Sequence, residues 1–348
     1  MEKNSGLYIH VPFCERKCGY CSFYSVRVND SAVSSWLAGI ELESRKYHGA
    51  HIRTLYIGGG TPSVLTLQQW HELMAVIRGH FDLSGVIEAT TEANPNSLTP
   101  EHVKFFREND FTRISLGVQS LNDDELKTLG RIHDSHTALK AMELVKTSGL
   151  VLSCDLIFAI PGQTLRTWDN SLRTVMNYAS HISAYQLTLE PDTPMGRKYN
   201  NGELNTSGYK FYRYAQYLLP RHEFMQYEIS SFAPDGLECK HNMAYWDHSD
   251  IIALGPSAVS YLDGVRYTNN PGGTITREEL SPRERAIELA ILSLRTKWGI
   301  SRKNILPEIY AVLSSMPEDL FVITPERIAL SPRGMRLGNA IWCELLDL

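Results

Sequence analysis

Short apolar runs alternate with longer amphipathic stretches through the chain as far as about residue 190. The short runs have the length and composition of β-strands: Leu7–Val11, Thr54–Ile57, Ile87–Thr91, Arg113–Gly117, Leu152–Phe158 and Ala184–Leu189. The stretches between them have helical periodicity: Val33–Tyr47, Leu67–Phe81, Pro100–Glu108, Ser135–Thr147 and Leu165–Tyr178. Strands separated by helix-length segments indicate βαβ units and a parallel sheet. Six such units predict an α/β protein built as an open, partial (β/α)6 barrel.

The residues that follow the predicted strands are polar or glycine. The first strand leads into a loop of cysteines, and the next three lead into Gly58-Gly59-Gly60-Thr61-Pro62, Glu92-Ala93-Asn94-Pro95 and Val118-Gln119. In barrels of parallel strands, ligands bind at the carboxyl ends of the strands. We therefore expect the functional site at this rim.

The alternation weakens after residue 200. There we expect a helix over Tyr209–Leu219 and a strand over Phe224–Phe232. A polar linker is expected over Pro271–Thr276 and a second helix over Pro282–Thr296. The last segment, Arg327–Leu348, is expected to form a strand, a turn and a helix. Chain length and these patterns predict a core barrel over residues 1–235 and a connecting segment over 236–275. A small, mainly helical C-terminal domain is expected over residues 276–348.

Composition is typical of a globular protein with a substantial core. Of the 348 residues, 43% are hydrophobic and 21% are charged, and the net charge is −5. This acidic balance lacks the basic footprint of a general nucleic-acid binder, so we expect no nucleic-acid partner. No stretch approaches the ~18 apolar residues of a membrane span, and the first residues lack the apolar core of a signal peptide. We therefore expect a cytoplasmic protein.

Three of the six cysteines, Cys14, Cys18 and Cys21, lie close together. In a cytosolic chain such cysteines are more often metal ligands than disulfides. The spacing C-x3-C-x2-C lets each thiolate hold one iron of a cubane cluster, which leaves the fourth iron open to an external ligand. The alternative is a zinc tetrahedron completed by His10. Because His10 falls within a strand-like run, we expect it to pack near the metal rather than bind it.

The segment that carries these cysteines, Leu7-Tyr8-Ile9-His10-Val11-Pro12-Phe13-Cys14 followed by Cys18-Gly19-Tyr20-Cys21, resembles the radical SAM superfamily. C-x3-C-x-Tyr-C is the signature of that superfamily. The flanking residues look like one branch, which contains the oxygen-independent coproporphyrinogen III oxidases (HemN) and the heme chaperones (HemW). The likeness spans at least residues 6–270. It implies a radical SAM barrel, a [4Fe–4S] cluster on the three cysteines and S-adenosylmethionine at the open iron, and it makes zinc a remote alternative.

The resemblance also assigns cofactor residues. The matched positions are the glycine-rich loop (Gly59, Gly60 and Thr61), a carboxylate (Glu92), three further pocket residues (Gln119, Arg131 and Asp155) and two aromatic side chains (Tyr8 and Tyr20). In the superfamily the loop lines the methionine moiety and the carboxylate accepts bonds from the ribose hydroxyls. The three further residues match positions that contact a second adenosylmethionine in HemN, and whether a second molecule binds here stays open. Taken singly, each of these polar residues could equally be a helix cap or a surface group.

Two departures from the oxidases favour the heme-chaperone side of the branch. The oxidases carry a fourth cysteine two positions after the third, where this chain has Phe23, and they have a longer segment before the first cysteine. Residues 241–246 match the H-N-x-x-Y-W motif of HemW-like proteins. Imidazole is a common heme ligand, and aromatic rings pack on porphyrins. The resemblance therefore points to His241 as a heme-site residue, and the alternative is a core histidine with aromatic packing.

Two classes of function follow from the resemblance. The first is a heme chaperone, which binds heme and transfers it to an acceptor protein that can be membrane-associated, with an electron donor such as flavodoxin for the cluster. The second is an enzyme, either an oxygen-independent coproporphyrinogen III oxidase, which is a decarboxylating dehydrogenase, or another tetrapyrrole-modifying radical SAM enzyme. In this superfamily the reduced cluster cleaves adenosylmethionine to methionine and a 5′-deoxyadenosyl radical. A tRNA-modifying enzyme would predict a basic face, which the composition does not indicate.

Overall fold

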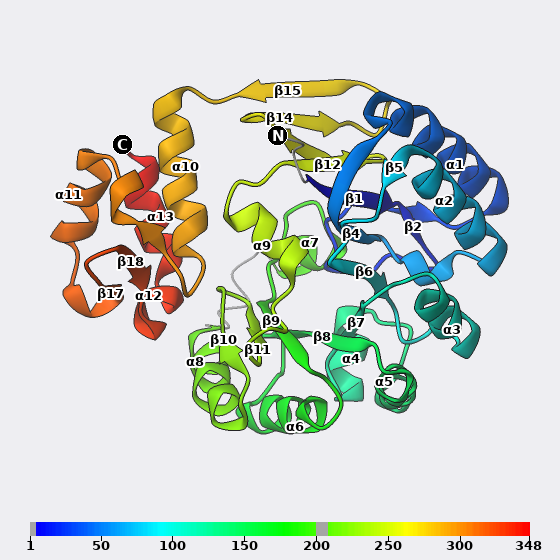
Figure 1. Ribbon diagram of the computed structural model, residues 1–348. Coiled ribbons are helices and arrows are strands. Elements are labelled where there is room, and N and C mark those ends of the chain that lie inside the picture. The colour runs from blue at the N-terminus through cyan, green and yellow to red at the C-terminus, as the bar shows by residue number, and fades with distance from the viewer. Residues whose placement is uncertain (1–4, 200–207) are drawn as a thin grey trace.

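The computed structural model describes residues 5–199 and 208–348. Its main sheet has the strand order β10-β11-β9-β8-β7-β6-β4-β1-β12-β13-β14-β15, with the short strand β5 (Phe81–Asp82) paired to β4. The long parallel strands are β1 (Ser5–Val11), β4 (Ala50–Gly59), β6 (Glu88–Ala93), β7 (Arg113–Gln119), β8 (Val151–Phe158), β9 (His181–Gln186) and β12 (Ile251–Leu254). The first six stand side by side in chain order, and β12 pairs with the other side of β1. The prediction of an α/β partial barrel is confirmed (Figure 1).

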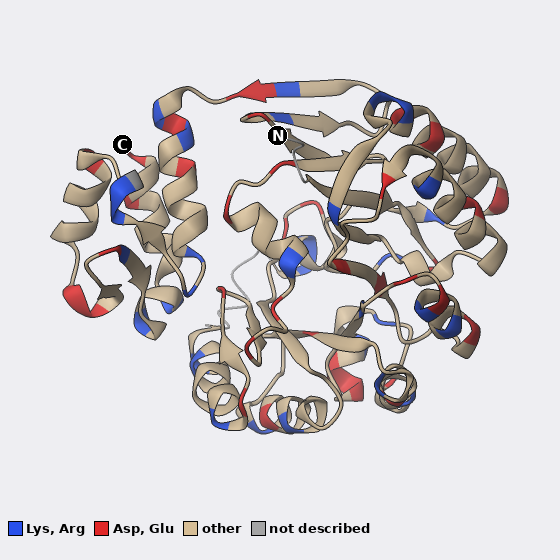
Figure 2. Ribbon diagram, viewed as in Figure 1, with Lys and Arg blue, Asp and Glu red and all other residues tan. Residues whose placement is uncertain are grey.

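The helices between these strands cover the outer face of the curved sheet (Figure 1). They are α1 (Asp30–Ser44), α2 (Leu67–His80), α3 (Pro100–Glu108), α4 (Asp123–Leu129), α5 (Ser135–Ser148) and α6 (Leu165–Met176). Local signals fix several of their ends. Capping boxes start α2 at Thr66 and α6 at Thr164, and Gly149 ends α5 with a φ of 84°. All but the short α4 follow the predicted pattern, and Figure 2 shows their acidic and basic residues interspersed.

Successive side chains along the barrel strands point alternately to the helices and to the interior. The helix-facing positions are apolar and belong to the main core, for example Leu55, Ile57, Ile114, Leu116, Leu156 and Ile182. The intervening positions are largely polar and line a cavity, among them Tyr56, Thr90, Glu92, Arg113, Ser115, Asp155 and Ser183. Parallel strands that are buried on both faces are normally apolar throughout. The polar inner face therefore indicates a ligand-binding interior rather than a packed core.

Three expected elements differ from the structure. The sixth strand begins at His181 instead of Ala184, because polar inward residues interrupt the apolar run. The strand expected over 224–232 is a hairpin of β10 (Met225–Gln226) and β11 (Ser231–Ala233), antiparallel to each other. The expected linker over 271–276 is a turn that leads directly into β15 (Ile275–Glu279).

The chain after the barrel contains two groups of elements. The first is α9 (Lys240–Trp246), β12, and the antiparallel strands β13 (Val259–Leu262), β14 (Val265–Asn269) and β15, which extend the main sheet. The second comprises α10 (Pro282–Leu294), β16 (Ile300–Ser301), α11 (Pro307–Ser315), β17 (Phe321–Ile323), β18 (Arg327–Leu330), α12 (Pro332–Arg336) and α13 (Gly338–Leu346). This group has its own apolar cluster and stands beside the barrel in Figure 1. Among the described residues, no helix is both long enough and apolar enough to cross a membrane.

Candidate functional site

The three clustered cysteines lie on the loop that follows β1. This loop includes the short strand β2 (Phe13–Cys14) and ends at β3 (Val26–Arg27), which pairs with β2 in parallel. The side chain of Arg16 donates from Nη2 to the carbonyl oxygen of Gly130 at 2.8 Å. The loop is thereby fixed to the C-terminal end of α4 as well as to the sheet.

All three thiols are free and partly exposed. The guanidinium of Arg131 donates from Nη1 to the sulfur of Cys18 at 3.3 Å, and the sulfur of Cys14 lies 3.6 Å from the hydroxyl oxygen of Thr61. Burial raises the pKa of the Cys21 thiol. Cationic and hydroxyl donors stabilise thiolates. The contacts to Cys14 and Cys18 therefore suit sulfurs that act as anionic ligands.

The donor set fits an iron–sulfur cluster better than a zinc ion. Among the described residues, no three His, Cys, Asp or Glu side chains are arranged to hold one metal ion. A cubane cluster does not need such convergence, since each thiolate binds a different iron. The zinc alternative also lacks its fourth ligand, because both ring nitrogens of His10 are engaged. Its Nε2 donates to the Tyr24 carbonyl oxygen at 3.0 Å, and its Nδ1 accepts from the Tyr8 hydroxyl at 3.0 Å.

The glycine loop after β4 packs tightly against the cysteine segment. Gly59 has a φ of 113°, and a Cβ there would lie 2.5 Å from Cε1 of His10. A Cβ on Gly60 would lie 2.6 Å from the carbonyl oxygen of Phe13, which accepts a bond from the Thr61 backbone N–H at 2.8 Å. Side chains at these positions would force the two segments apart. The two glycines therefore allow the loop after β4 to pack closely against the cysteine segment, in addition to any close approach to a ligand.

Glu92 lies at the carboxyl end of β6 with both carboxylate oxygens held. Tyr56 donates from its hydroxyl to Oε1 at 2.9 Å, and the backbone N–H of Gly59 donates to Oε2 at 3.0 Å. Burial raises the pKa of Glu92 to about 7 despite these two donors. The carboxylate is thus fixed in position, and its remaining lone pairs can accept bonds from a ligand.

Asp155 and Gln119 face the same space from β8 and from the end of β7. The hydroxyl of Ser115 donates to Oδ2 of Asp155 at 3.0 Å, and burial raises the pKa of Asp155 to about 6. Gln119 has a φ of 65°, in the left-handed region that non-glycine residues rarely adopt. Strained backbone of this kind is concentrated at binding and active sites.

Arg131 connects this space to the cysteine loop. Besides its bond to Cys18, its Nη2 donates to the Gly117 carbonyl oxygen at 2.9 Å and to Oδ1 of Asn94 at 2.6 Å. Tyr20 lies on the cysteine loop, and burial raises its pKa. The cationic side chain therefore stands between the thiols and the barrel interior.

These elements enclose one cavity of about 420 Å³ at the carboxyl ends of the strands. Eleven of the thirteen residues singled out from the sequence line it: Cys14, Cys18, Cys21, Tyr20, Gly59, Gly60, Thr61, Glu92, Gln119, Arg131 and Asp155. The other two, Tyr8 and His241, do not line it. Tyr8 lies behind the wall, where its ring centroid is 6.0 Å from that of Tyr56.

Sequence reasoning missed most of the interior wall. The missed lining residues include Tyr56, Thr90, Arg113, Ser115, Ser153, His181, Ser183, Cys239 and Asn242. A signal for those on the strands was available, because polar residues recur there at every second position. Asn242 of α9 belongs to the H-N-x-x-Y-W motif, but the motif does not indicate that its side chain reaches the cavity, and no pattern marks Cys239 at the N-cap of α9.

His241 lies on α9 with its ring turned away from the cavity, and its exposed fraction is only 1%. Its Nδ1 is 2.9 Å from the hydroxyl oxygen of Thr54, and its ring lies 5.1 Å from that of Tyr56 and 5.5 Å from that of Tyr245. Burial lowers its pKa to about 3, so the imidazole is neutral at physiological pH. A heme contact by His241 would therefore require α9 to move, and that role stays a prediction.

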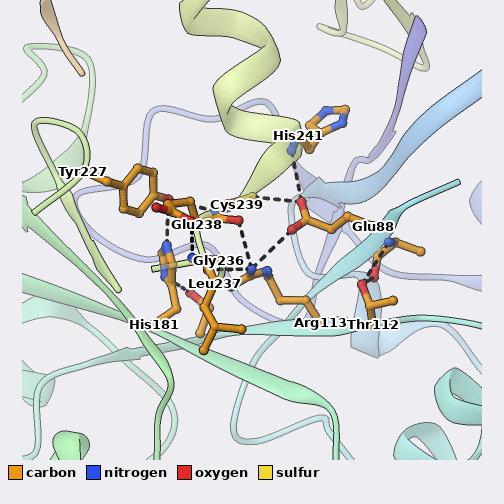
Figure 3. A network of polar contacts seen from close by, with 12 residues as sticks. Glu88, Thr112, Arg113, His181, Tyr227, Gly236, Leu237, Glu238, Cys239 and His241 are labelled. Carbon is orange, nitrogen blue, oxygen red and sulfur yellow. Dashed lines mark hydrogen bonds and ion pairs between the residues drawn. The ribbon is translucent and has the colours of Figure 1, made fainter. Parts of the chain in front are cut away.

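A buried ion pair holds the start of α9 against the barrel (Figure 3). Arg113 donates from Nη2 to Oε2 of Glu88 at 3.2 Å and to the Leu237 carbonyl oxygen at 2.9 Å. The other oxygen of Glu88 accepts from the backbone N–H of His241 at 3.0 Å and from the thiol of Cys239 at 3.5 Å. Cys239 is therefore held in a network of polar groups, and burial raises the pKa of its thiol.

Comparison with known families and relatives agrees with this geometry. The radical SAM superfamily profile matches residues 8–175. The heme chaperone HemW of Lactococcus lactis is 31% identical to this chain, with 99% of this chain and 98% of the relative covered. The heme chaperone HemW of Bacillus subtilis is 32% identical, with 96% of this chain and 97% of the relative covered. The heme chaperone HemW of Escherichia coli is 34% identical, with 77% of this chain and 74% of the relative covered.

One solved structure shares the fold over nearly the whole chain. Coproporphyrinogen III oxidase (HemN) from Escherichia coli, a radical SAM enzyme, superposes with a TM-score of 0.84. The alignment covers 99% of this chain and 90% of that enzyme, at 20% identity. At this identity the likeness concerns the fold.

Proposed function

Because the chain belongs to the radical SAM superfamily, in the branch of the HemW heme chaperones and HemN, we propose that it binds a [4Fe–4S] cluster through Cys14, Cys18 and Cys21 and holds S-adenosylmethionine in the adjoining cavity. The observation that carries this proposal is that three free, partly exposed thiols line one cavity together with polar side chains of the barrel strands. Three thiolates would hold three irons of a cubane and leave the fourth without a ligand from the protein.

The proposed cofactor residues divide the cavity into regions. Gly59, Gly60 and Thr61 would line the methionine moiety, where the open backbone of the loop permits close approach. Glu92 would accept bonds from the ribose hydroxyls, with Tyr56 and Gly59 keeping its carboxylate in place.

The remaining pocket residues face the same space. Gln119, Arg131 and Asp155 would contact the bound cofactor or a second molecule of it, and Tyr20 would lie beside them. When bound and reduced, the cluster supplies the single electron that cleaves adenosylmethionine. The chain itself contributes binding groups, a buried setting and a fixed geometry.

We further propose that the principal role is to bind heme and deliver it to an acceptor protein, which can be membrane-associated. Support comes from the heme chaperones that match over nearly the whole chain. A second support is Phe23, which is 66% exposed at the cavity mouth where the oxidases carry a fourth cysteine. An electron donor such as flavodoxin would reduce the cluster. The elements after residue 275 would form an accessory domain.

The alternative is an oxygen-independent coproporphyrinogen III oxidase or another tetrapyrrole-modifying enzyme. The shared fold with HemN favours this alternative, because the same barrel can position a porphyrinogen for radical chemistry. Fold likeness alone does not establish an activity. The choice between the two rests on an experiment.

That experiment is a turnover assay on the anaerobically reconstituted protein. Adenosylmethionine, a reductant and coproporphyrinogen III are added, and the tetrapyrroles are separated by chromatography. We expect no conversion beyond the level of the cluster-free Cys18→Ser variant, in a sample that binds heme in a parallel absorbance titration. Protoporphyrinogen well above that control would establish the oxidase and reject the chaperone proposal.

A further inference from the structure

The motif residues of α9 contact different parts of the molecule. Asn242 lines the cavity, while Trp246 packs under the guanidinium of Arg295 at 4.5 Å from ring centroid to Cζ. His241 and Tyr245 pack on each other at 5.5 Å behind the cavity wall. The side chain of His241 therefore packs behind the residues that line the cavity and does not line it itself.

The space for this ring is built by neighbouring strands. Gly6 of β1 has no side chain, and a Cβ there would lie 3.3 Å from Cε1 of His241. Thr54 of β4 supplies the hydroxyl that meets Nδ1 at 2.9 Å. The second ring nitrogen has no hydrogen-bond partner within residues 5–199 and 208–348. One hydrogen bond and packing against the rings of Tyr8, Tyr56 and Tyr245 thus hold the imidazole.

A short chain of contacts runs from this ring to the cavity. The imidazole stacks on Tyr56, with 5.1 Å between ring centroids and 28° between ring planes. The hydroxyl of Tyr56 in turn donates to Oε1 of Glu92 at 2.9 Å. Tyr56 and Glu92 both line the cavity, whereas His241 does not. Close-packed interiors transmit small displacements, so a change at the histidine reaches the ring of Tyr56.

We propose that His241 is a positioning residue for the adenosylmethionine site, acting through Tyr56 on the carboxylate of Glu92. This inference rests on the proposed binding of adenosylmethionine at Glu92. It gives the histidine of the H-N-x-x-Y-W motif a role on the cofactor side of the cavity wall. The imidazole acts by packing and by its bond to Thr54, because a ring whose pKa lies near 3 adds no charge beside the carboxylate.

The test measures adenosylmethionine binding to the anaerobically reconstituted full chain. Three variants are compared: His241→Ala, Tyr56→Phe and the double variant. We expect each single substitution to raise the dissociation constant about tenfold, the size of one weakened bond to a charged group. If His241 acts through Tyr56, the double variant loses about tenfold in total rather than the hundredfold of independent effects.

A spectroscopic readout and two further variants separate this role from a general structural one. The change that adenosylmethionine causes in the electron paramagnetic resonance spectrum of the reduced cluster should weaken in His241→Ala. His241→Phe, which restores a ring against Tyr56, should recover binding to within about threefold of wild type. His102→Phe removes another buried histidine, one that does not line the cavity, and should leave binding unchanged.

Heme titrations of the same samples discriminate the two roles proposed for His241. The positioning role predicts that heme affinity stays within about twofold in both His241 variants. Loss of heme binding in His241→Phe with intact adenosylmethionine binding would overturn the inference and make the residue a heme ligand. Unchanged adenosylmethionine binding in His241→Ala would also overturn it. Failure of the wild type to bind adenosylmethionine would instead reject the proposed function.

Discussion

The guanidinium of Arg131 donates a hydrogen bond from Nη1 to the sulfur of Cys18 at 3.3 Å, joining residues 113 positions apart in the chain. The same side chain is anchored from Nη2 to the carbonyl oxygen of Gly117 at 2.9 Å. A cation is therefore held against one of the three sulfurs proposed to carry the cluster. Hydrogen bonds and net charge near the sulfurs are main determinants of the potential of such clusters.

Replacing Arg131 with Met should make the cluster harder to reduce. The substitution removes a positive charge and a hydrogen bond that stabilise the more negative, reduced state, and we expect the potential to fall by on the order of 50–100 mV. The measurement is a redox titration of the reconstituted protein followed by electron paramagnetic resonance. Arg16→Met is the matched control, because Arg16 lies on the same loop but bonds a backbone carbonyl. Equal shifts in both variants would contradict a specific contribution from the bond to Cys18.

Glu92 predicts a pH-dependent cost to folding. Burial raises its pKa to about 7, above the 4.5 of an accessible glutamate, so the folded state binds this proton more tightly than the unfolded state. Stability therefore falls as the pH rises from about 4.5 toward 7, and the full cost is present above pH 7. Asp155, with its pKa raised to about 6, acts in the same direction.

Glu92→Gln should therefore stabilise the cluster-free protein at pH 8 but not at pH 5. The rise in the pKa of Glu92 from 4.5 to about 7 corresponds to about 2–4 kcal/mol in the free energy of unfolding. Urea titrations at both pH values measure it, and the gain should come with weaker adenosylmethionine binding. A difference between wild type and variant that does not depend on pH would show that Glu92 ionises normally in the folded protein.

The fold could be predicted from the sequence because its parallel strands are adjacent in chain order. Local patterns sufficed for strands such as β4 and β6, and the glycines and Glu92 at their ends had to share one rim. Polar residues at a common edge of a parallel sheet meet whatever the details of packing. For this reason the order of strands and loops along the chain was enough to place the cysteines, the glycine loop and Glu92 around one cavity.

The unpredicted part depends on contacts between distant segments. The thiol of Cys239 meets Glu88 across 151 positions, and His241 meets Thr54 across 187. Strand β12 reaches β1 from the far end of the barrel sequence. Neither periodicity nor spacing encodes such pairs, so the turn of His241 away from the cavity had no signal in the sequence.

A comparison of two glycines tests the packing of the loop after β4. Gly59→Ala places a Cβ 2.5 Å from His10 at a φ of 113°, and we expect it to lower the free energy of unfolding by about 2 kcal/mol or more. Gly79→Ala in α2 meets no atom within 4 Å, and alanine favours helix, so it should stabilise by about 0.5–1 kcal/mol. Thermal unfolding of both variants measures whether each substitution lowers or raises the free energy of unfolding. A small loss in Gly59→Ala would show that the loop after β4 can shift to accommodate the added methyl group.

The buried pair of Arg113 and Glu88 predicts a large and non-additive effect. Their side chains are only 4% and 5% exposed, and Arg113→Met leaves the carboxylate of Glu88 in the interior without its cation. We expect a loss of about 3–5 kcal/mol in the free energy of unfolding, because an uncompensated buried charge is costly. Faster amide exchange at His241 should accompany it, since the backbone N–H of His241 is bonded to Glu88.

The double variant Glu88→Gln, Arg113→Met separates the charge from the contact. With no charge left to bury, it should recover a substantial part of the loss and be more stable than Arg113→Met alone. Arg283→Met serves as the surface control, because its ion pair with Glu308 is 51% and 37% exposed and exposed pairs contribute little. Urea denaturation of wild type, Glu88→Gln, Arg113→Met, the double variant and Arg283→Met gives the comparison. Additive losses in the double variant would mean that packing of the two side chains, rather than their charges, holds the start of α9 against the barrel.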